Sequence, residues 1–176
     1  VLGHGLEQPH GVVQQLERAT AHAVAVVEEL ADVMLHRHGN LDALARAGGS
    51  GDVTGQREIW ANNLGPDVPT SAADGTYLYV LKDNGTMNCL DLKTGKPFYE
   101  NQRIELGTYS SSPLVADGKI YSINEEGTVT VTKAGPTFEI LGTNKFDGYT
   151  LASPVAVDDD LFIRTGEALY CIGNKR

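Results

Sequence analysis

Three consecutive carboxylates, Asp158, Asp159 and Asp160, form the densest run of potential metal ligands in the sequence. Oxygen ligands of this kind suit Ca²⁺. Neighbouring residues of a strand point to opposite faces, however, and the run falls where a turn is expected. We therefore interpret it as a solvated turn and predict no metal site there.

The pair His36 and His38 is a second candidate for metal binding. Residues two apart share a face on a strand but not on a helix. The surrounding pattern predicts a helix, no cysteine lies nearby, and Glu28, Glu29 and Asp32 are a turn or more away. We interpret the pair as an exposed helix end.

The remaining reactive side chains do not assemble into a catalytic pattern. Cys89 and Cys171 have no metal-ligand spacing and occupy matching places in two repeats, so we expect small buried strand residues rather than a disulfide. All five histidines precede Ser50, which leaves the rest of the chain without a Ser/His/Asp set. No glycine-rich phosphate loop is present.

The composition indicates a globular protein with an acidic surface. The hydrophobic fraction is 41% and the net charge is -9, which argues against a nucleic-acid partner. No apolar run reaches the roughly 18 residues of a membrane span. The start "VLGHGLEQPHG" has no secretory signal pattern.

The chain changes character near residue 48. Residues 1–47 lack Phe, Trp and Tyr and are predicted to be helical, Gly48 to Gly51 form a flexible joint, and residues 52–176 form a separate β region. An apolar helical stripe is predicted, comprising Val13, Leu16, Thr20, Ala23, Val27, Leu30 and Met34. The segment "NLDALARA" predicts a short second helix, capped by Asn40.

The β region repeats itself about every 40 residues, as Tyr79, Tyr121 and Phe162 show. Each unit has short strands separated by Gly, Asn and Asp turns, which is typical of the four-stranded blades of a β-propeller. We expect inner strands near residues 70–73, 113–116 and 154–157.

An inventory of strands predicts an all-β partial propeller of about three four-stranded antiparallel blades, preceded by the helical segment. "QREIWANNL" is an outer strand without its blade, two complete units follow, and the final unit stops after its third strand. We therefore expect the chain to be the C-terminal part of a longer propeller.

The stretches "SSPLVADGKIYSINEEGTVTV" and "CLDLKTGKPFY" resemble the propeller proteins with pyrroloquinoline-quinone-like repeats, which include quinoprotein dehydrogenases and the BamB outer-membrane assembly lipoprotein. The resemblance covers residues 51–175. It implies that Asp91, Thr94 and Gly95 form a docking turn, and that Trp60 and Tyr99 dock against the adjacent blade.

The resemblance leaves two classes of function open. One is a non-catalytic, BamB-like scaffold that binds a protein or another ligand, with no cofactor. The other is a remnant of a quinone-dependent dehydrogenase, which would need a stacking Trp, an Asp base and Ca²⁺ ligands; we find no such set and predict no enzyme. A third alternative is a truncated propeller without a selected function.

Four residues are candidates to face a central channel: Tyr109, Ser110, Ser111 and Ser112. Small hydroxyl residues also suit a crowded axis, and we favour that interpretation. We expect a protein partner, and a homo-oligomer formed through exposed blade faces or the helix. The resemblance implies a periplasmic or extracellular location.

Overall fold

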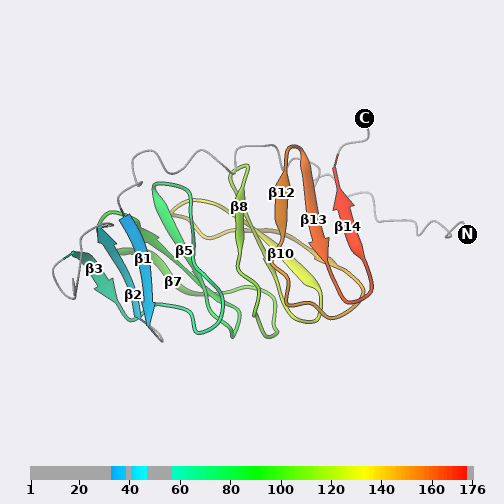
Figure 1. Cartoon of the computed structure of the whole chain (residues 1–176), viewed down its shortest axis with the longest axis horizontal. Coiled ribbons are helices and arrows are strands. Elements are labelled where there is room, and N and C mark those ends of the chain that lie inside the picture. The colour runs from blue at the N-terminus through cyan, green and yellow to red at the C-terminus, as the bar shows by residue number, and fades with distance from the viewer. Residues whose placement is uncertain (1–32, 39–40, 47–56, 174–176) are drawn as a thin grey trace, which may run out of the picture.

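The computed structural model describes residues 33–38, 41–46 and 57–173. Its regular elements are all β-strands. Within these ranges the chain has no helix that is long and apolar enough to cross a membrane. Four antiparallel sheets lie in a row along the long axis of the molecule (Figure 1).

Each sheet is a meander of strands that are consecutive in the chain. The first sheet contains β1 (Val33–His38), β2 (Leu41–Arg46) and β3 (Glu58–Asn62). The second contains β4 (Ala72–Ala73), β5 (Tyr77–Leu81), β6 (Thr86–Asp91) and β7 (Pro97–Arg103). The third contains β8 (Leu114–Ala116), β9 (Lys119–Ile123), β10 (Thr128–Lys133) and β11 (Ile140–Lys145). The fourth contains β12 (Val155–Val157), β13 (Asp160–Arg164) and β14 (Leu169–Ile172).

The registers of the last three sheets confirm the repeat. Each sheet has one aromatic residue at the centre of its second strand, facing a small residue of the third strand. The pairs are Tyr79 with Cys89, Tyr121 with Val131, and Phe162 with Cys171. The predicted inner strands are also confirmed: β4, β8 and β12 occupy the expected positions, and β8 contacts both of the others.

Each interior sheet buries both faces, because strand residues alternate in direction. We call the face toward the next sheet in the chain the forward face and the opposite one the backward face. In the second sheet, Leu78, Val80 and Leu90 form the backward face and pack with Leu44 and Trp60 of the first sheet.

The forward face of the second sheet packs against the third sheet. It consists of Tyr79, Leu81, Met87 and Cys89, which pack with Ile120. Tyr121 and Val131 form part of the forward face of the third sheet, which packs with Leu161 and Ile163 of the fourth sheet. Three apolar layers between four sheets therefore make up the core.

The predicted helix is wrong for the part of it that the structure describes. Residues 33–38, which include Met34, His36 and His38, form β1, and most of "NLDALARA" forms β2. Ala and Leu favour helices, but propensity is a weak prior that tertiary pairing overrides. Here β2 supplies the partner that β3 needs, with Leu44 opposite Trp60. The rest of the predicted helix and the joint at residues 48–51 lie outside the described residues.

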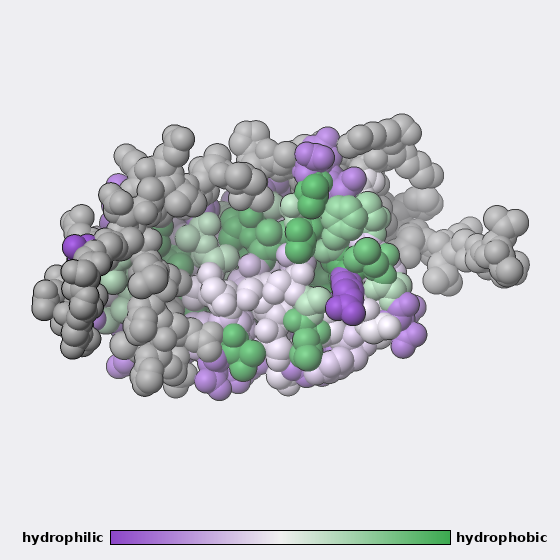
Figure 2. All heavy atoms as spheres, viewed as in Figure 1, coloured by the Kyte–Doolittle hydropathy of each residue, from purple (hydrophilic) through white to green (hydrophobic). Residues whose placement is uncertain are grey.

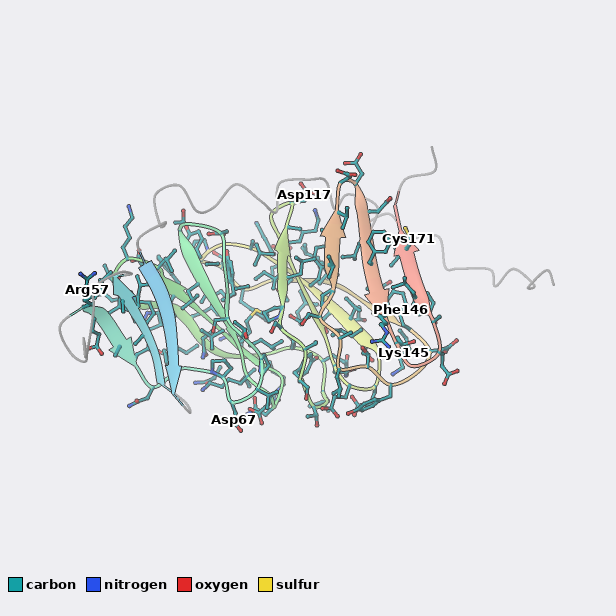
Figure 3. All side chains as sticks on the ribbon, in the orientation of Figure 1. Arg57, Asp67, Asp117, Lys145, Phe146 and Cys171 are labelled. Atoms are coloured by element: carbon teal, nitrogen blue, oxygen red, sulfur yellow. The ribbon has the colours of Figure 1, made fainter. Side chains whose placement is uncertain are left out.

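Two further expectations need correction. The strand in "QREIWANNL" is not without a sheet, because β3 pairs with β2, and the described residues form four sheets rather than about three. Cys171 is exposed whereas Cys89 is buried, since β14 lies in the last sheet of the row. Figure 3 labels Cys171 on that strand. Both thiols are free, and no disulfide joins them.

Candidate functional site: the linkers and turns between sheets

Trp60 lies between the first and second sheets. Its side chain is buried, and its Nε1 donates a hydrogen bond of 2.9 Å to the carbonyl oxygen of Leu92. Gly95 lies against the ring: a Cβ there would come within 2.5 Å of the indole, and the φ of 68° is one that glycine adopts readily. Glycine therefore gives the ring room and allows the turn.

The turn beneath Trp60 is organised by one carboxylate. Asp91 accepts hydrogen bonds from the backbone N–H groups of Lys93 and Thr94 and from the Thr94 hydroxyl. The hydroxyl bond to Thr94 is the main cause that lowers the pKa of Asp91 below its ordinary value. This carboxylate therefore belongs to the turn and has no ligand role in this geometry.

Tyr99 has the corresponding place between the second and third sheets. It is half-buried on β7 opposite Cys89, and its ring meets the edge of Phe138 at a centroid distance of 5.6 Å. Burial raises the pKa of its hydroxyl above the usual range, and the nearby Cys89 thiol acts in the same direction. That Trp60 and Tyr99 hold the sheets together remains a prediction, which the Discussion turns into measurements.

Two of the four candidate channel residues do not face open space. The Tyr109 side chain is fully buried, and its hydroxyl donates to the carbonyl oxygen of Glu105 at 2.8 Å. Ser111 is buried as well and donates to the carbonyl oxygen of Ile123 at 2.7 Å. Both are enclosed because the segment that carries them is clamped between two sheets.

Backbone hydrogen bonds form this clamp. The Tyr109 N–H donates to the carbonyl oxygen of Asp83 in the second sheet, and the Glu125 N–H of the third sheet donates to that of Thr108. The next linker repeats the arrangement, with Thr150 bonded to Glu125 and Gly166 bonded to Tyr149. Each linker thus connects the turn of one sheet to the turn of the following sheet.

Ser112 joins a chain of hydroxyls at the start of the inner strands. The Thr70 N–H donates to Ser112 Oγ, and the Ser112 N–H donates to Ser153 Oγ, both at 2.9 Å. Thr70, Ser112 and Ser153 occupy equivalent positions in three successive sheets, as the strand registers show. We call this arrangement the hydroxyl ladder. Sequence reasoning noticed the serines but missed the ladder.

Ser110 belongs to the one cluster of polar side chains that spans two linkers. Its hydroxyl donates to Glu125 Oε1 at 2.5 Å, while Tyr149 donates to Glu125 Oε2 at 2.9 Å. The hydrogen bond to Glu125 is the main cause that raises the pKa of Tyr149. A shallow depression of about 380 Å³ adjoins this cluster, lined by Tyr149, Thr150, Leu151, Ala152, Arg164, Thr165 and Gly166.

The acidic run lies in the hairpin between β12 and β13. Val157 pairs with Asp160, so Asp158 and Asp159 form its turn, and both are exposed. Within the ranges that the structure describes, no three His, Cys, Asp or Glu side chains are grouped closely enough to hold a metal ion. The equivalent turn of the third sheet contains Asp117, which Figure 3 labels and which pairs with Lys119.

The arrangement resembles known proteins in fold. BamB from Moraxella catarrhalis matches with a TM-score of 0.54 and 12% identity, over 78% of this chain and 41% of that one. A europium-containing methanol dehydrogenase matches with a TM-score of 0.47 and 15% identity, over 67% and 23%. The N-terminal domain of Nup159 matches with a TM-score of 0.45 and 14% identity, over 74% and 38%.

These likenesses define the class of the chain, a partial β-propeller with a fold similar to that of BamB. The chain spans less than half the length of that BamB chain. No family model matches the sequence. No curated protein matches it either.

Proposed function

We infer that the chain is a non-catalytic propeller scaffold that binds a protein segment at a surface built by its linkers and turns. We call this the turn surface and define it by Leu106, Ser110, Glu125, Tyr149 and Leu151. Leu106, Tyr149 and Leu151 are 72%, 55% and 55% exposed, which is a large exposure for apolar side chains. This exposure of apolar groups beside a carboxylate is the observation that carries the proposal.

The turn surface is held in a fixed shape by its own bonds. Leu106 and Tyr149 flank the turn that contains Glu125: Asn124 Nδ2 donates to the Leu106 carbonyl oxygen, and Tyr149 donates to the carboxylate. A surface that is already ordered loses little conformational entropy when a partner binds. It therefore suits recognition by contact area.

Charge defines the chemistry of the partner. Glu125 and Glu126 have no ion pair with a cation among the described residues. Lys145, the nearest cation of the repeat, donates instead to the carbonyl oxygen of Glu126 and to Thr128 Oγ1. The net charge of the chain is -9. The partner that fits is an extended protein segment with apolar and basic side chains.

The dehydrogenase alternative has less support in the described residues. The single Trp of the sequence, Trp60, is buried between two sheets, where it cannot stack on a cofactor at the turn surface. The hydroxyls of Tyr109, Ser110 and Ser111 are donated within the protein. A truncated propeller without selected function is the remaining alternative. We propose a periplasmic or extracellular location on the sequence resemblance alone.

Selection from a displayed library of random peptides against the full chain tests the scaffold function. We expect enriched peptides that combine basic and aromatic residues, and weaker binding when Tyr149 and Leu151 are replaced by Ser. Phe98→Ser is the matched control, because Phe98 is an apolar residue of similar exposure, 49%, on β7. Peptides without a basic preference, or equal loss in the control, would contradict the proposal.

A titration with pyrroloquinoline quinone and Ca²⁺, followed by calorimetry, tests the dehydrogenase alternative directly. We expect no saturable heat. A saturable signal that Tyr149→Ser abolishes would overturn the non-catalytic function and assign the turn surface to a cofactor.

A further inference from the structure

The forward face of the fourth sheet is apolar and open, whereas the same face of the third sheet is buried. The equivalent positions are Val157 and Ala116, exposed by 52% and 3%, and Leu169 and Val129, exposed by 67% and 0%. Val155 of β12 is also 51% exposed. Figure 2 shows apolar side chains gathered over this part of the molecule, toward the right of the view.

The geometry of the other junctions says what kind of surface fits here. All three junctions of the chain join the forward face of one sheet to the backward face of the next. The hydroxyl ladder runs in the same sense, since an N–H of one sheet donates to a hydroxyl of the following sheet. Continuing both patterns requires the backward face of another sheet of this repeat.

The opposite end of the chain presents such a face. In β3, Trp60 is buried against the second sheet, whereas its neighbours Ile59 and Ala61 are exposed, Ile59 by 39%. Alternation along the strand places Ile59 and Ala61 on the backward face of the first sheet. Both end sheets also have three strands where the interior sheets have four.

We propose that two copies of this chain associate head to tail, with the forward face of β12–β14 of each packed against the backward face of β1–β3 of the other. An interface between two different patches closes into a ring when its rotation allows, and otherwise produces an open filament. Each copy contributes four sheets, and the portion that aligns with BamB is 41% of that chain. Two copies therefore approach the size of one complete ring. This pairing does not depend on the proposed role of the turn surface.

Multi-angle light scattering and sedimentation velocity of the full chain over a wide concentration range test the pairing. We expect a species of twice the chain mass, and loss of that species in Val157→Glu and in Ile59→Glu, with unchanged far-ultraviolet circular dichroism. Leu106→Glu is the control, because Leu106 is more exposed than either but lies on the turn surface. It should retain the dimer.

Mixing the two variants distinguishes head-to-tail pairing from pairing through two identical faces. The Val157→Glu chain keeps an intact backward face and the Ile59→Glu chain keeps an intact forward face, so the mixture should regain a weaker dimer. If Ile59→Glu alone leaves the dimer intact, the two faces are identical and the proposal fails. A wild-type chain that stays monomeric, or forms species larger than two copies, also overturns it.

The thiols give a readout that does not depend on hydrodynamics. Cys171 is exposed on the proposed interface, whereas Cys89 is buried and burial raises its pKa to about 12. The rate at which a maleimide labels Cys171 should fall with the fraction of free chain as concentration rises, and Val157→Glu should remove this dependence. A labelling rate that is independent of concentration while scattering reports a dimer would place the interface elsewhere.

Discussion

The junction between the first and second sheets and the junction between the second and third sheets solve the same packing problem with different side chains. At the first, Trp60 supplies both the apolar ring and the hydrogen bond, through Nε1 to the Leu92 carbonyl oxygen. At the second, these two tasks are divided. Tyr99 supplies a ring against Phe138, and the fully buried Tyr79 supplies the polar contact.

Tyr79 connects the two sheets through one hydroxyl. It donates to Asp74 Oδ2 at 2.7 Å and accepts from the Gly135 N–H at 2.7 Å. The Cys89 thiol meets the carbonyl oxygen of the same glycine at 3.5 Å. The comparison teaches that the position of a docking ring in the repeat does not fix its energetic weight, because the neighbouring polar contacts differ.

The largest expected effect comes from removing the rings. We expect Trp60→Ala to lower the free energy of unfolding by about 3 to 5 kcal/mol, the usual cost for a buried aromatic residue. Tyr99 is only half-buried, so Tyr99→Ala should cost about 2 kcal/mol by the area removed from water. Denaturant unfolding followed by circular dichroism measures both, since Trp60 is the only tryptophan.

Phe98→Ala on the same strand as Tyr99 is the control for the loss of an exposed ring. It should change the free energy of unfolding by less than about 0.5 kcal/mol, as is usual for surface sites. A loss under about 1 kcal/mol in both Trp60→Ala and Tyr99→Ala would contradict their docking roles.

The second effect separates the two glycine turns. Gly95→Ala places a methyl group within 2.5 Å of the Trp60 ring, whereas a Cβ at Gly135 meets nothing within 4 Å. Both have positive φ, 68° and 122°, so both substitutions incur backbone strain. Only Gly95→Ala adds overpacking, which costs about 1 to 3 kcal/mol more.

A double-mutant cycle tests whether that extra cost comes from the ring. In a Trp60→Ala background the clash is absent, so Gly95→Ala should then cost no more than Gly135→Ala does. If the cost of Gly95→Ala is the same with and without the ring, the contact between Trp60 and Gly95 is not what constrains this turn.

The repeat was predictable from sequence because hairpin chemistry is local. Gly85 and Gly127 mark turns with positive φ, and the strands on either side follow from alternation and β-branched residues. The register of Tyr79, Tyr121 and Phe162 then follows from their spacing.

The first sheet was not predictable in the same way. The Ala- and Leu-rich residues of β2 favour a helix in isolation, and only pairing with β3 makes them a strand. One clue was available: "GN" at residues 39–40 is a dipeptide that also occurs in tight hairpins, although we took it as a helix stop.

The polar contacts of the candidate site lay beyond sequence reasoning for a different reason. Glu125 meets Ser110 and Tyr149 from two different linkers, and Ser112 meets Ser153 of the next sheet. These contacts depend on how one sheet is placed on another. The repeat predicts which residues are equivalent, but it does not predict which of them touch across a junction.

A smaller effect sharpens the role of Tyr79. Tyr79→Phe removes the acceptor of the Gly135 N–H and the donor to Asp74, so we expect a loss of about 1 to 3 kcal/mol for groups left unsatisfied. Tyr121→Phe is the matched control: its hydroxyl is buried at the equivalent position and has no hydrogen-bond partner among the described residues. That substitution should be neutral or stabilising. Equal losses in the two variants would show that the hydroxyl of Tyr79 does not join the sheets.

The smallest expected effect is a pH dependence that only the first junction should show. Hydrogen bonds, chiefly from Thr94, hold the pKa of Asp91 below its ordinary value. A carboxyl with a lowered pKa in the folded state stabilises the fold above its unfolded pKa of about 4, and this contribution is lost as the pH falls through the folded pKa. The difference in unfolding free energy between wild type and Asp91→Asn should therefore shrink as the pH falls below about 4. Thr94→Val should shrink it at neutral pH as well, because the main donor is gone. The second junction has Lys133, Ala134 and Gly135 in its turn and no carboxyl at this place, so Gly135→Ala should show no such acid dependence. A difference between wild type and Asp91→Asn that stays constant with pH would mean that the ionised carboxylate does not stabilise the turn beneath Trp60.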